Sequence, residues 1–205
     1  MASHPSSLQF YFDFISPYGY FASLRIDELA ARHGRTVEWH PMLLGVSVMK
    51  VMGLKPLLDT PLKGPYVKRD VLRYARRHGI TLGLDLERPQ MNPLTAARAY
   101  CWTARHQPDS ASALARALFH AHWHDGRELS APAALASLAL PPTLPAETLI
   151  AAAQGEEAAR LLRAEVEASL AAGVFGSPTV VVDGEMFWGI DKFDELEHWL
   201  ATGGW

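Results

Sequence analysis

The aromatic stretch FYFDFISPYGY, residues 10–20, predicts a strand that is followed at once by a helix. Phe10 to Ile15 form a short, almost continuously apolar run, which is typical of a strand buried on both faces of an α/β sheet. Ser16 and Pro17 are residue types favoured at the N-cap and in the first helical turn. Ser16 is therefore expected where a central strand ends, which is where open α/β sheets bind ligands. A plain N-cap remains the alternative, because a functional role needs a partner for the hydroxyl.

The elements around this stretch follow from periodicity and turn residues. Apolar residues recur at helical spacing over residues 18–33, and residues 36–42 predict a second strand, with Pro41 indicating a sheet edge or a strand end. No convincing strand is found from residue 43 to about 155; helices are predicted at 46–52, 65–78, 94–106, 110–124 and from 130. A helix is predicted at 156–172. It is followed by a hairpin of two strands, 179–182 and 185–188, joined by the turn Asp183-Gly184. Asp191 is expected to cap a last helix.

Without its helical middle, this order is that of a thioredoxin fold. We therefore predict an α/β, thioredoxin-like domain of the βαβ–ββα type with a large all-helical insertion. Residues 1–43 and 156–205 would form the thioredoxin-like domain, and residues 44–155 the inserted helical domain.

Composition excludes several classes of protein. The net charge of −3 argues against nucleic-acid binding, and the single Cys101 excludes an internal disulfide and a CxxC redox pair. The first residues, MASHPSS, carry no secretory signal pattern, and the longest apolar stretch, residues 131–140, is too short to span a bilayer. We expect a cytoplasmic protein that binds neither nucleic acid nor membrane.

A thioredoxin-like arrangement would bring Ser16 beside Gly176-Ser177-Pro178, the loop before the third strand. The Ser177–Pro178 bond is a candidate cis peptide, which would leave the Ser177 backbone N–H and C=O to pair with an extended peptide. The alternative is a simple turn that opens the strand. Further along, Asp191 at a helix start could hold the ammonium group of an amino acid whose carboxylate meets the helix amides; here the alternative is a plain cap.

Together these sites suit a small thiol peptide such as glutathione. A hydroxyl at Ser16 can donate a hydrogen bond to a thiolate, whereas a Cys there would react with it. The residue type therefore favours activation of a bound thiol over disulfide exchange.

At the level of motifs, the chain resembles the 2-hydroxychromene-2-carboxylate isomerases, which belong with kappa-class glutathione transferases in the DsbA-like group. The segments FYFDFISPYGYFA, GVFGSPTVVVDGEMFWGIDK and LKGPYVKRDVLRYARRHG carry this resemblance. It implies a glutathione-dependent cis–trans isomerase of naphthalene-type aromatic degradation that forms a homodimer. It also implies that Ser16 is catalytic, that Ser177 precedes a cis Pro178, and that Ile190, Asp191 and Lys192 bind the glutamyl end of glutathione.

Four further residues are candidates for binding a small aromatic carboxylate. Tyr18 and Trp188 could wall a flat substrate, and Lys63 or Arg73 could meet its carboxylate. The alternatives are ordinary core packing for the aromatic residues and a solvated basic helix face, with an Asp70–Arg73 pair, for the cations. Two departures from the family stand out. Leu54 replaces a common Asn, and Lys192 replaces a common Arg, which keeps the charge but loses the planar fork.

No metal site is predicted. His120, His122 and His124 precede Asp125, but on a helix only His120 and His124 share a face, and no third ligand is expected nearby. The histidines are interpreted as surface or packing residues.

Three functions remain open from the sequence. The first is the glutathione-dependent isomerase, and the second is a transferase that conjugates glutathione to electrophiles. The third is a non-catalytic, thioredoxin-like module that binds peptides. The first two need the Ser16 hydroxyl for turnover, and they differ in whether glutathione is consumed.

Overall fold

The structure is a computed structural model that describes residues 7–140 and 143–205. Two sequence predictions touch the remaining residues. Most of the segment MASHPSS, for which no signal pattern is predicted, lies outside the described residues, as do residues 141–142 at the start of the predicted break PPTLP.

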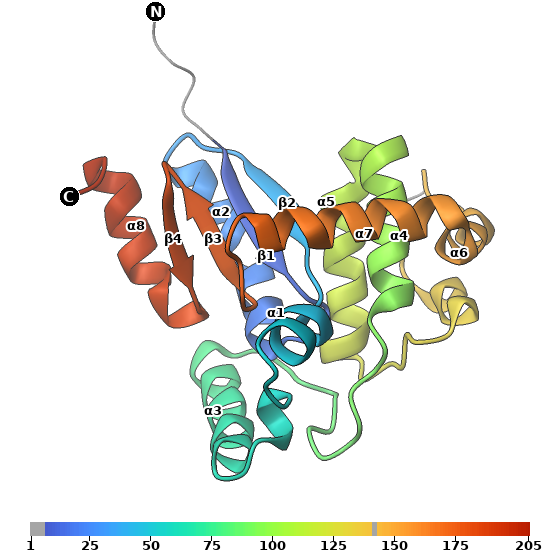
Figure 1. Ribbon diagram of the computed structural model, residues 1–205, viewed down its shortest axis with the longest axis horizontal. Coiled ribbons are helices and arrows are strands. Elements are labelled where there is room, and N and C mark those ends of the chain that lie inside the picture. Colours follow the sequence, from blue (N-terminus) through green and yellow to red (C-terminus); the bar gives the residue numbers. More distant parts are fainter. Residues whose placement is uncertain (1–6, 141–142) are drawn as a thin grey trace, which may run out of the picture.

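A four-stranded mixed sheet forms the centre of the molecule, in the order β2-β1-β3-β4 (Figure 1). The strands are β1 (Leu8–Phe12), β2 (Val37–Pro41), β3 (Thr179–Val182) and β4 (Glu185–Trp188). β1 and β2 are parallel, while β3 runs antiparallel to both β1 and β4. The predicted parallel crossover, the edge position of the second strand and the closing hairpin are therefore confirmed. Asp183 and Gly184 both have positive φ, 53° and 89°, as a two-residue hairpin turn requires.

Helices surround the sheet and form the insertion between β2 and β3. The α-helices are α1 (Pro17–Ser23), α2 (Ile26–Arg32), α3 (Lys63–His78), α4 (Leu94–His106), α5 (Pro108–Phe119), α6 (Ala146–Gln154), α7 (Glu156–Ala171) and α8 (Phe193–Thr202). The shorter helical turns are η1 (Gly45–Val51), η2 (Leu57–Asp59), η3 (His120–His124), η4 (Pro132–Ser137) and η5 (Ile190–Lys192), of which η1 and η3 are π-helical. None of the helices in the described parts of the chain has the length and apolar character to cross a membrane.

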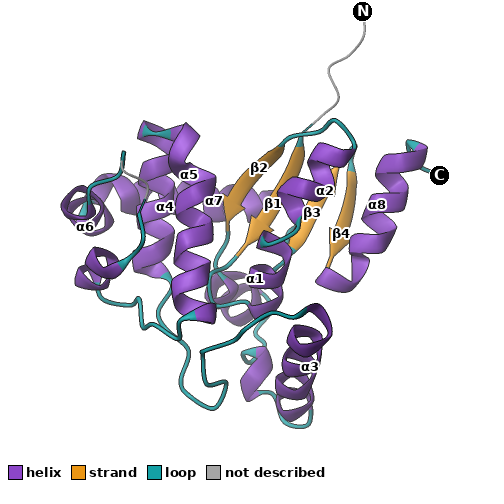
Figure 2. Cartoon of the chain, turned by 180° about the vertical axis from the view of Figure 1, so that it is seen from behind, coloured by secondary structure: helices purple, strands orange, loops and turns teal. Residues whose placement is uncertain are grey.

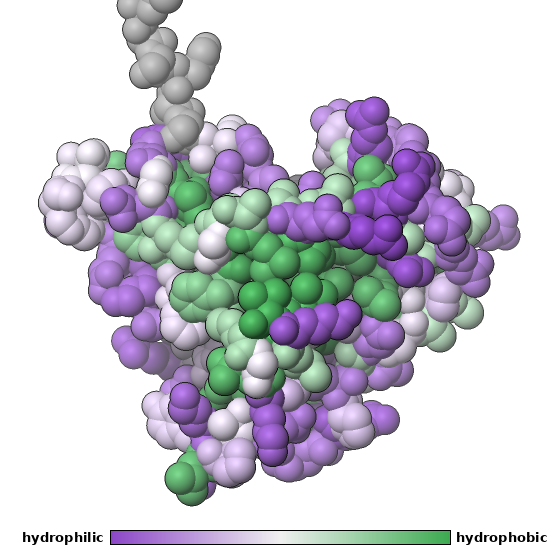
Figure 3. All heavy atoms as spheres, in the orientation of Figure 1, coloured by the Kyte–Doolittle hydropathy of each residue, from purple (hydrophilic) through white to green (hydrophobic). Residues whose placement is uncertain are grey.

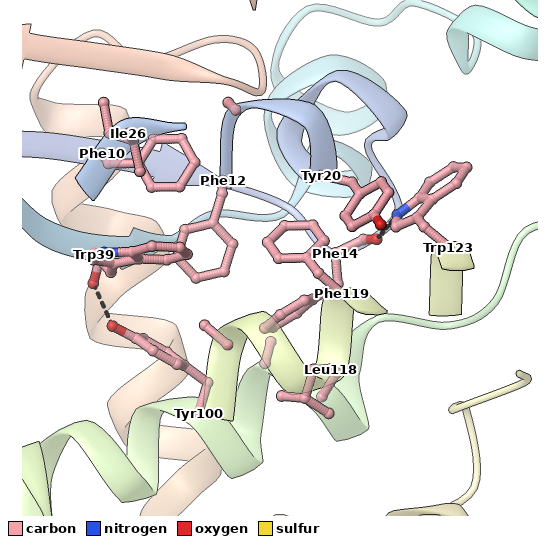
Figure 4. Packing of buried hydrophobic residues seen from close by; sticks show 14 of the residues in the cluster. Phe10, Phe12, Phe14, Tyr20, Ile26, Trp39, Tyr100, Leu118, Phe119 and Trp123 are labelled. Carbon is pink, nitrogen blue, oxygen red and sulfur yellow. Dashed lines mark hydrogen bonds between the residues drawn. The ribbon is translucent and has the colours of Figure 1, made fainter. Parts of the chain in front are cut away.

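One aromatic core joins the sheet to the insertion. Phe12 of β1 meets the rings of Trp39 and Tyr100 edge-on, and Phe14 packs against Phe119 of α5 with ring centroids 4.9 Å apart (Figure 4). The Tyr100 hydroxyl donates to the Trp39 carbonyl at 2.7 Å. Burying each such ring contributes roughly 2–3 kcal/mol to stability. The insertion is therefore fixed to the strand that leads to Ser16.

The two faces of the sheet are covered differently. α2 lies behind the sheet in Figure 1 and in front of it in Figure 2, over the face that carries the aromatic core. On the other face Tyr11, Met42 and Val174 form a smaller buried cluster, beside which α7 crosses the sheet. α3 lies beyond the end of the sheet at which β1 stops, in both views.

The predicted single helix over residues 18–33 is wrong, because the chain forms two helices there. The Ser23 hydroxyl donates to the Tyr20 carbonyl at 2.7 Å, and the Arg25 amide bonds to the Ala22 carbonyl. Side-chain bonds of this kind compete with the helical ladder. The first helix therefore ends at Ser23, and α2 begins at Ile26.

The insertion agrees with the predicted helices in most places. α4 has the predicted bounds, α3 begins two residues early, and the long helix predicted at 110–124 ends as the π-helical turn η3. α6 was not predicted. Its signals are weak, since an alanine-rich segment follows Pro145 and its buried residues are Leu149 and Ala153.

Candidate active site

Ser16 lies at the junction of β1 and α1, and its hydroxyl makes two hydrogen bonds. It accepts the backbone N–H of Gly19 at 3.0 Å, which makes Ser16 the N-cap of α1. It also donates to the backbone carbonyl of Ser177 at 2.9 Å. The side chain is 3% exposed and contributes to the wall of a cleft. Ser16 is therefore the N-cap of α1, and its hydroxyl also has a second partner, the Ser177 carbonyl, as a functional role requires.

The loop before β3 meets this junction as the sequence predicts. The Ser177–Pro178 peptide bond is cis. The Ser177 hydroxyl accepts the backbone N–H of Asp13 at 2.9 Å, so the loop is attached to β1 as well as to Ser16. The Ser177 carbonyl lies outside the paired residues of β3 and accepts the Ser16 hydroxyl.

The close approach of α1 to this loop requires a glycine. A Cβ at Gly19 would lie 2.8 Å from the Ser177 hydroxyl oxygen and 3.1 Å from the Ser16 Cβ. Contacts under 3.0 Å force a neighbouring atom to move. Gly19 thus lets the first turn of α1 lie directly against the cis-proline loop.

Asp13 is a residue of this site that sequence reasoning missed. Its carboxylate accepts the backbone N–H groups of Leu44 at 2.7 Å and Ile15 at 3.2 Å, and the side chain is 1% exposed. Burial raises the pKa of Asp13 to about 6, although both hydrogen bonds oppose the shift. Asp13 thereby ties together the end of β1, the loop of Ser177 and the first residue of the insertion. The available signal was an acidic residue inside an apolar run.

A cleft of about 1150 Å³ opens in front of Ser16. Its inner wall includes Ser16, Tyr18, Ser177 and Trp188, and its outer wall comes from η1, η2, the start of α3 and residues 86–90. The apolar side chains of the outer wall are Val48, Met49, Met52, Leu54, Leu58, Val67 and Leu86. Figure 3 shows apolar residues gathered on this side of the molecule, in the area between α7 and α3.

The structure places three of the four predicted substrate residues in the cleft wall. Tyr18 lines it, and its hydroxyl donates to Asp70 at 2.7 Å; burial and this bond raise the pKa of Tyr18. Trp188 is 53% exposed and packs against Phe175 with ring centroids 4.8 Å apart. Lys63 also lines the cleft.

Arg73 does not reach the cleft. It pairs with Asp70 three residues earlier and lies over the ring of Tyr66, so the competing interpretation of a helix-surface pair is the one observed. Three other cations line the cleft instead, namely Lys55, Lys68 and Arg88. Lys68 pairs with Glu87 at 2.6 Å, and Arg88 follows in the same loop and was not singled out from the sequence.

The predicted glutamyl-binding residues lie on η5, which packs beside α1. Ile190 is buried, Asp191 is exposed, and Lys192 pairs with Glu195 at 2.7 Å. The prediction that Asp191 caps the last helix is wrong. Gly189, with φ of 106°, turns the chain into η5, and α8 begins only at Phe193 without a side-chain cap. None of the hydrogen bonds between described residues involves the Asp191 side chain.

A family model described as a DsbA-like thioredoxin domain matches residues 7–201. The chain belongs to this family. Membership confirms the predicted fold class, and the matched segment spans both parts of the thioredoxin-like unit together with the insertion.

Curated relatives also match along nearly the whole chain. A 2-hydroxychromene-2-carboxylate isomerase from Sphingobium xenophagum is 28% identical over 198 residues, which cover 95% of this chain and 97% of the relative. The enzyme of the same name from Pseudomonas putida is 29% identical over 195 residues, covering 93% and 92%. These matches confirm the resemblance to the isomerases that the motifs predicted.

Solved structures agree with these relatives. A structure of 2-hydroxychromene-2-carboxylate isomerase superposes with a TM-score of 0.79 at 26% identity, covering 96% of this chain and 94% of the other. The cytosolic disulfide reductase DsbM from Pseudomonas aeruginosa, solved with GSH, superposes with a TM-score of 0.64 at 20% identity. The second likeness concerns the fold alone.

Proposed function

We propose that the protein is a glutathione-dependent isomerase of the 2-hydroxychromene-2-carboxylate type, acting in aromatic degradation. The observation that carries this proposal is the position of Ser16. A buried serine hydroxyl lies at the base of a large, mainly apolar cleft, in a chain that is similar along nearly its whole length to relatives that carry the isomerase name. The only cysteine, Cys101, is buried in the core, which leaves a bound thiol as the source of a sulfur nucleophile.

The donor set around Ser16 fits the cysteinyl part of glutathione. The Ser177 carbonyl, now bonded to the Ser16 hydroxyl, is an acceptor that an amide N–H of an extended peptide can take over. Once displaced, the Ser16 hydroxyl can turn its proton toward the sulfur while its oxygen still accepts the Gly19 amide. A donor in that position stabilises a thiolate and lowers the pKa of the thiol.

The glutamyl end has a candidate corner on η5. Asp191 is exposed and can accept hydrogen bonds from an ammonium group, while Lys192 can meet a carboxylate after leaving Glu195. The exposed ion pair with Glu195 costs little to exchange. Pro178 and Ile190 would provide apolar support beneath the peptide. We therefore keep Ser16, Ser177, Pro178, Ile190, Asp191 and Lys192 as the proposed glutathione site.

The cleft suits a flat aromatic carboxylate. Bound glutathione would supply the sulfur that adds to an unsaturated ring-closed substrate and leaves after bond rotation. The chain's own part is to hold the substrate between Tyr18 and Trp188 and to pair its carboxylate with Lys63. Preorganised donors around developing negative charge contribute more to such reactions than a strong base does. Leu54, where the resemblance to the isomerases leads us to expect Asn, makes the outer wall more apolar.

Product analysis distinguishes the alternative function, a glutathione transferase, from the isomerase. An isomerase returns glutathione unchanged after each turnover, whereas a transferase forms a conjugate and consumes it. The homodimer and the cytoplasmic location predicted from the sequence also remain proposals. Sedimentation of the purified protein tests the first, and fractionation of cells that produce it tests the second.

Calorimetric titration with reduced glutathione tests the cofactor directly. We expect saturable binding at one site per chain, weakened by Asp191→Ala. Ser23→Ala is the control for this site. Like Ser16, Ser23 is a buried serine whose hydroxyl donates to a backbone carbonyl, but Ser23 does not line the cleft. The control should bind like the unaltered protein. Absence of binding at millimolar glutathione would contradict both the isomerase and the transferase and would leave the peptide-binding module.

A further inference from the structure

Three side chains with metal-binding atoms converge on the turn that ends α5. The rings of His120 and His124 stack with centroids 4.1 Å apart. The Nδ1 atoms of His120 and His124 lie 3.5 Å and 2.9 Å from the same oxygen, Oδ1 of Asp125. One ligand atom from each of the three residues lies within 4.8 Å of the others. The expectation that no third ligand lies near the two histidines is therefore wrong.

The π-helical turn explains why the third ligand is present. The Asp125 amide bonds to the His120 carbonyl at 3.1 Å, and the Arg127 amide bonds to the Ala121 carbonyl at 2.9 Å. These wider turns bring the Asp125 carboxylate close to the Nδ1 atoms of both histidines, which an ordinary α-helix would not do. His122 of the same turn is excluded, because it is buried and its Nδ1 lies 3.0 Å from the Arg127 carbonyl.

Two of the three separations between ligand atoms are close to those around a tetrahedral ion. Metal–nitrogen and metal–oxygen bonds of about 2.0–2.2 Å place neighbouring ligand atoms roughly 3.4 Å apart. The two Nδ1–Oδ1 distances, 3.5 Å and 2.9 Å, lie on either side of this value. The side chains of His120, His124 and Asp125 are 53%, 40% and 30% exposed, so they can adjust and solvent can reach the remaining position.

A neighbouring cation orients the carboxylate. Arg127 Nε lies 3.4 Å from the other oxygen, Oδ2 of Asp125, which leaves Oδ1 directed at the histidines. Outer partners that fix a ligand in this way strengthen metal binding.

We propose that His120, His124 and Asp125 bind a divalent transition-metal ion of the Zn²⁺ class, with water completing the coordination. Imidazole and carboxylate ligands suit such ions. The site is separate from the cleft, since none of the three residues lines it. It lies on the turn whose Trp123 donates to the Phe14 carbonyl at 2.9 Å (Figure 4) and accepts the amides of Gly83 and Leu84. A bound ion would therefore have a structural role.

Titration of the purified protein with Zn²⁺, followed by calorimetry at neutral pH, tests this site. We expect one ion per chain, and we expect His120→Ala and His124→Ala each to weaken binding by at least about tenfold. His106→Ala is the matched control, because the His106 Nε2 lies 3.1 Å from a Glu157 oxygen, and no second histidine of residues 7–140 and 143–205 pairs with that carboxylate. The control should bind as the unaltered protein does.

Three outcomes would overturn the proposal. The first is no binding at millimolar Zn²⁺, and the second is unchanged affinity in the His120→Ala, His124→Ala double variant. The third is loss of binding in His40→Ala instead, since His40 lies 3.1 Å from Glu165 and 3.7 Å from Glu38. His106 and His120 are exposed and His124 is partly exposed, and circular dichroism of each variant checks that it is folded.

Discussion

The two walls of the cleft are built in different ways. On the inner wall, Ser16 and Ser177 are joined to each other and to the backbone, and behind them the carboxylate of buried Asp13 accepts two backbone amides. On the outer wall, side chains such as Met49 and Leu54 are exposed, and the cation Lys68 is held only by an exposed partner. The inner wall can therefore fix a reacting atom, whereas the outer wall can adapt to a substrate. Substitutions on the two walls should have different consequences.

The largest effect is expected at Ser16. Ser16→Ala should lower turnover of 2-hydroxychromene-2-carboxylate with glutathione by roughly 10²–10³, the usual cost of removing one preorganised donor. The same change should cost about 1 kcal/mol of stability through the lost cap. Steady-state kinetics and urea unfolding measure the two effects. Ser23→Ala should lower stability without lowering turnover, and equal activity of Ser16→Ala and the unaltered protein would remove the distinction between the walls.

Asp13 should give the inner wall a pH-dependent stability. Burial raises the pKa of Asp13 to about 6 in the folded state, above the ordinary aspartate value of 3.8, so the folded state binds the proton more tightly. The stability that Asp13 contributes is complete below pH ~4 and is lost as the pH rises through ~6, by about 3 kcal/mol in total. Asp13→Asn should abolish this component. Urea unfolding at several pH values measures it, and parallel stability curves for the two proteins would contradict the prediction.

A methyl group at Gly19 should disturb the inner wall by an intermediate amount. Gly19→Ala places a Cβ 2.8 Å from the Ser177 hydroxyl, so that hydroxyl must move off the Asp13 amide. We expect a loss of about 1–3 kcal/mol of stability, as for other overpacked sites. Gly45→Ala is the control, because nothing lies within 4 Å of its Cβ and its φ is not positive. Thermal unfolding should separate the two variants, and equal midpoints would show that the contact is easily relieved.

The smallest of these effects is expected on the outer wall. Lys63→Met should raise KM for the carboxylate substrate about tenfold, equivalent to about 1.4 kcal/mol, with little change in kcat. Arg73→Met should leave KM nearly unchanged, because Arg73 is paired with Asp70 outside the cleft. Initial rates measured over a range of substrate concentrations give KM and kcat for both variants. A larger effect of Arg73→Met would mean that the substrate carboxylate lies outside the cleft.

Much of the inner wall could be predicted from the sequence. The apolar strand, the Ser-Pro start of α1 and the Ser177-Pro178 dipeptide each have strong local signals, and the order of strands then brings them together. Asp13 could not be placed in this way. Its partner Leu44 lies where the insertion begins, and the position of that residue depends on how the insertion packs on the core.

The geometry of single turns caused the remaining differences. Ser23 bonds back to the Tyr20 carbonyl and ends α1, although the apolar spacing continues through residue 33. Gly189 turns the chain before α8, so Asp191 does not cap that helix. The π-helical turn η3 brings Asp125 to two histidines that spacing alone left without a third ligand. Each of these depends on one turn whose geometry periodicity does not report.

The Ser16 hydroxyl both caps α1 and faces the proposed active site, and this affects how activity is inferred for related sequences. Because that oxygen also begins α1, a descendant that had lost all catalytic activity would still be under selection to keep the serine for folding. The serine is therefore a weak marker when an activity is transferred from one sequence to another. Lys63, which forms no ion pair within residues 7–140 and 143–205, lies under no such structural constraint. Its retention across a lineage would be the more informative sign that the ancestral substrate is still bound.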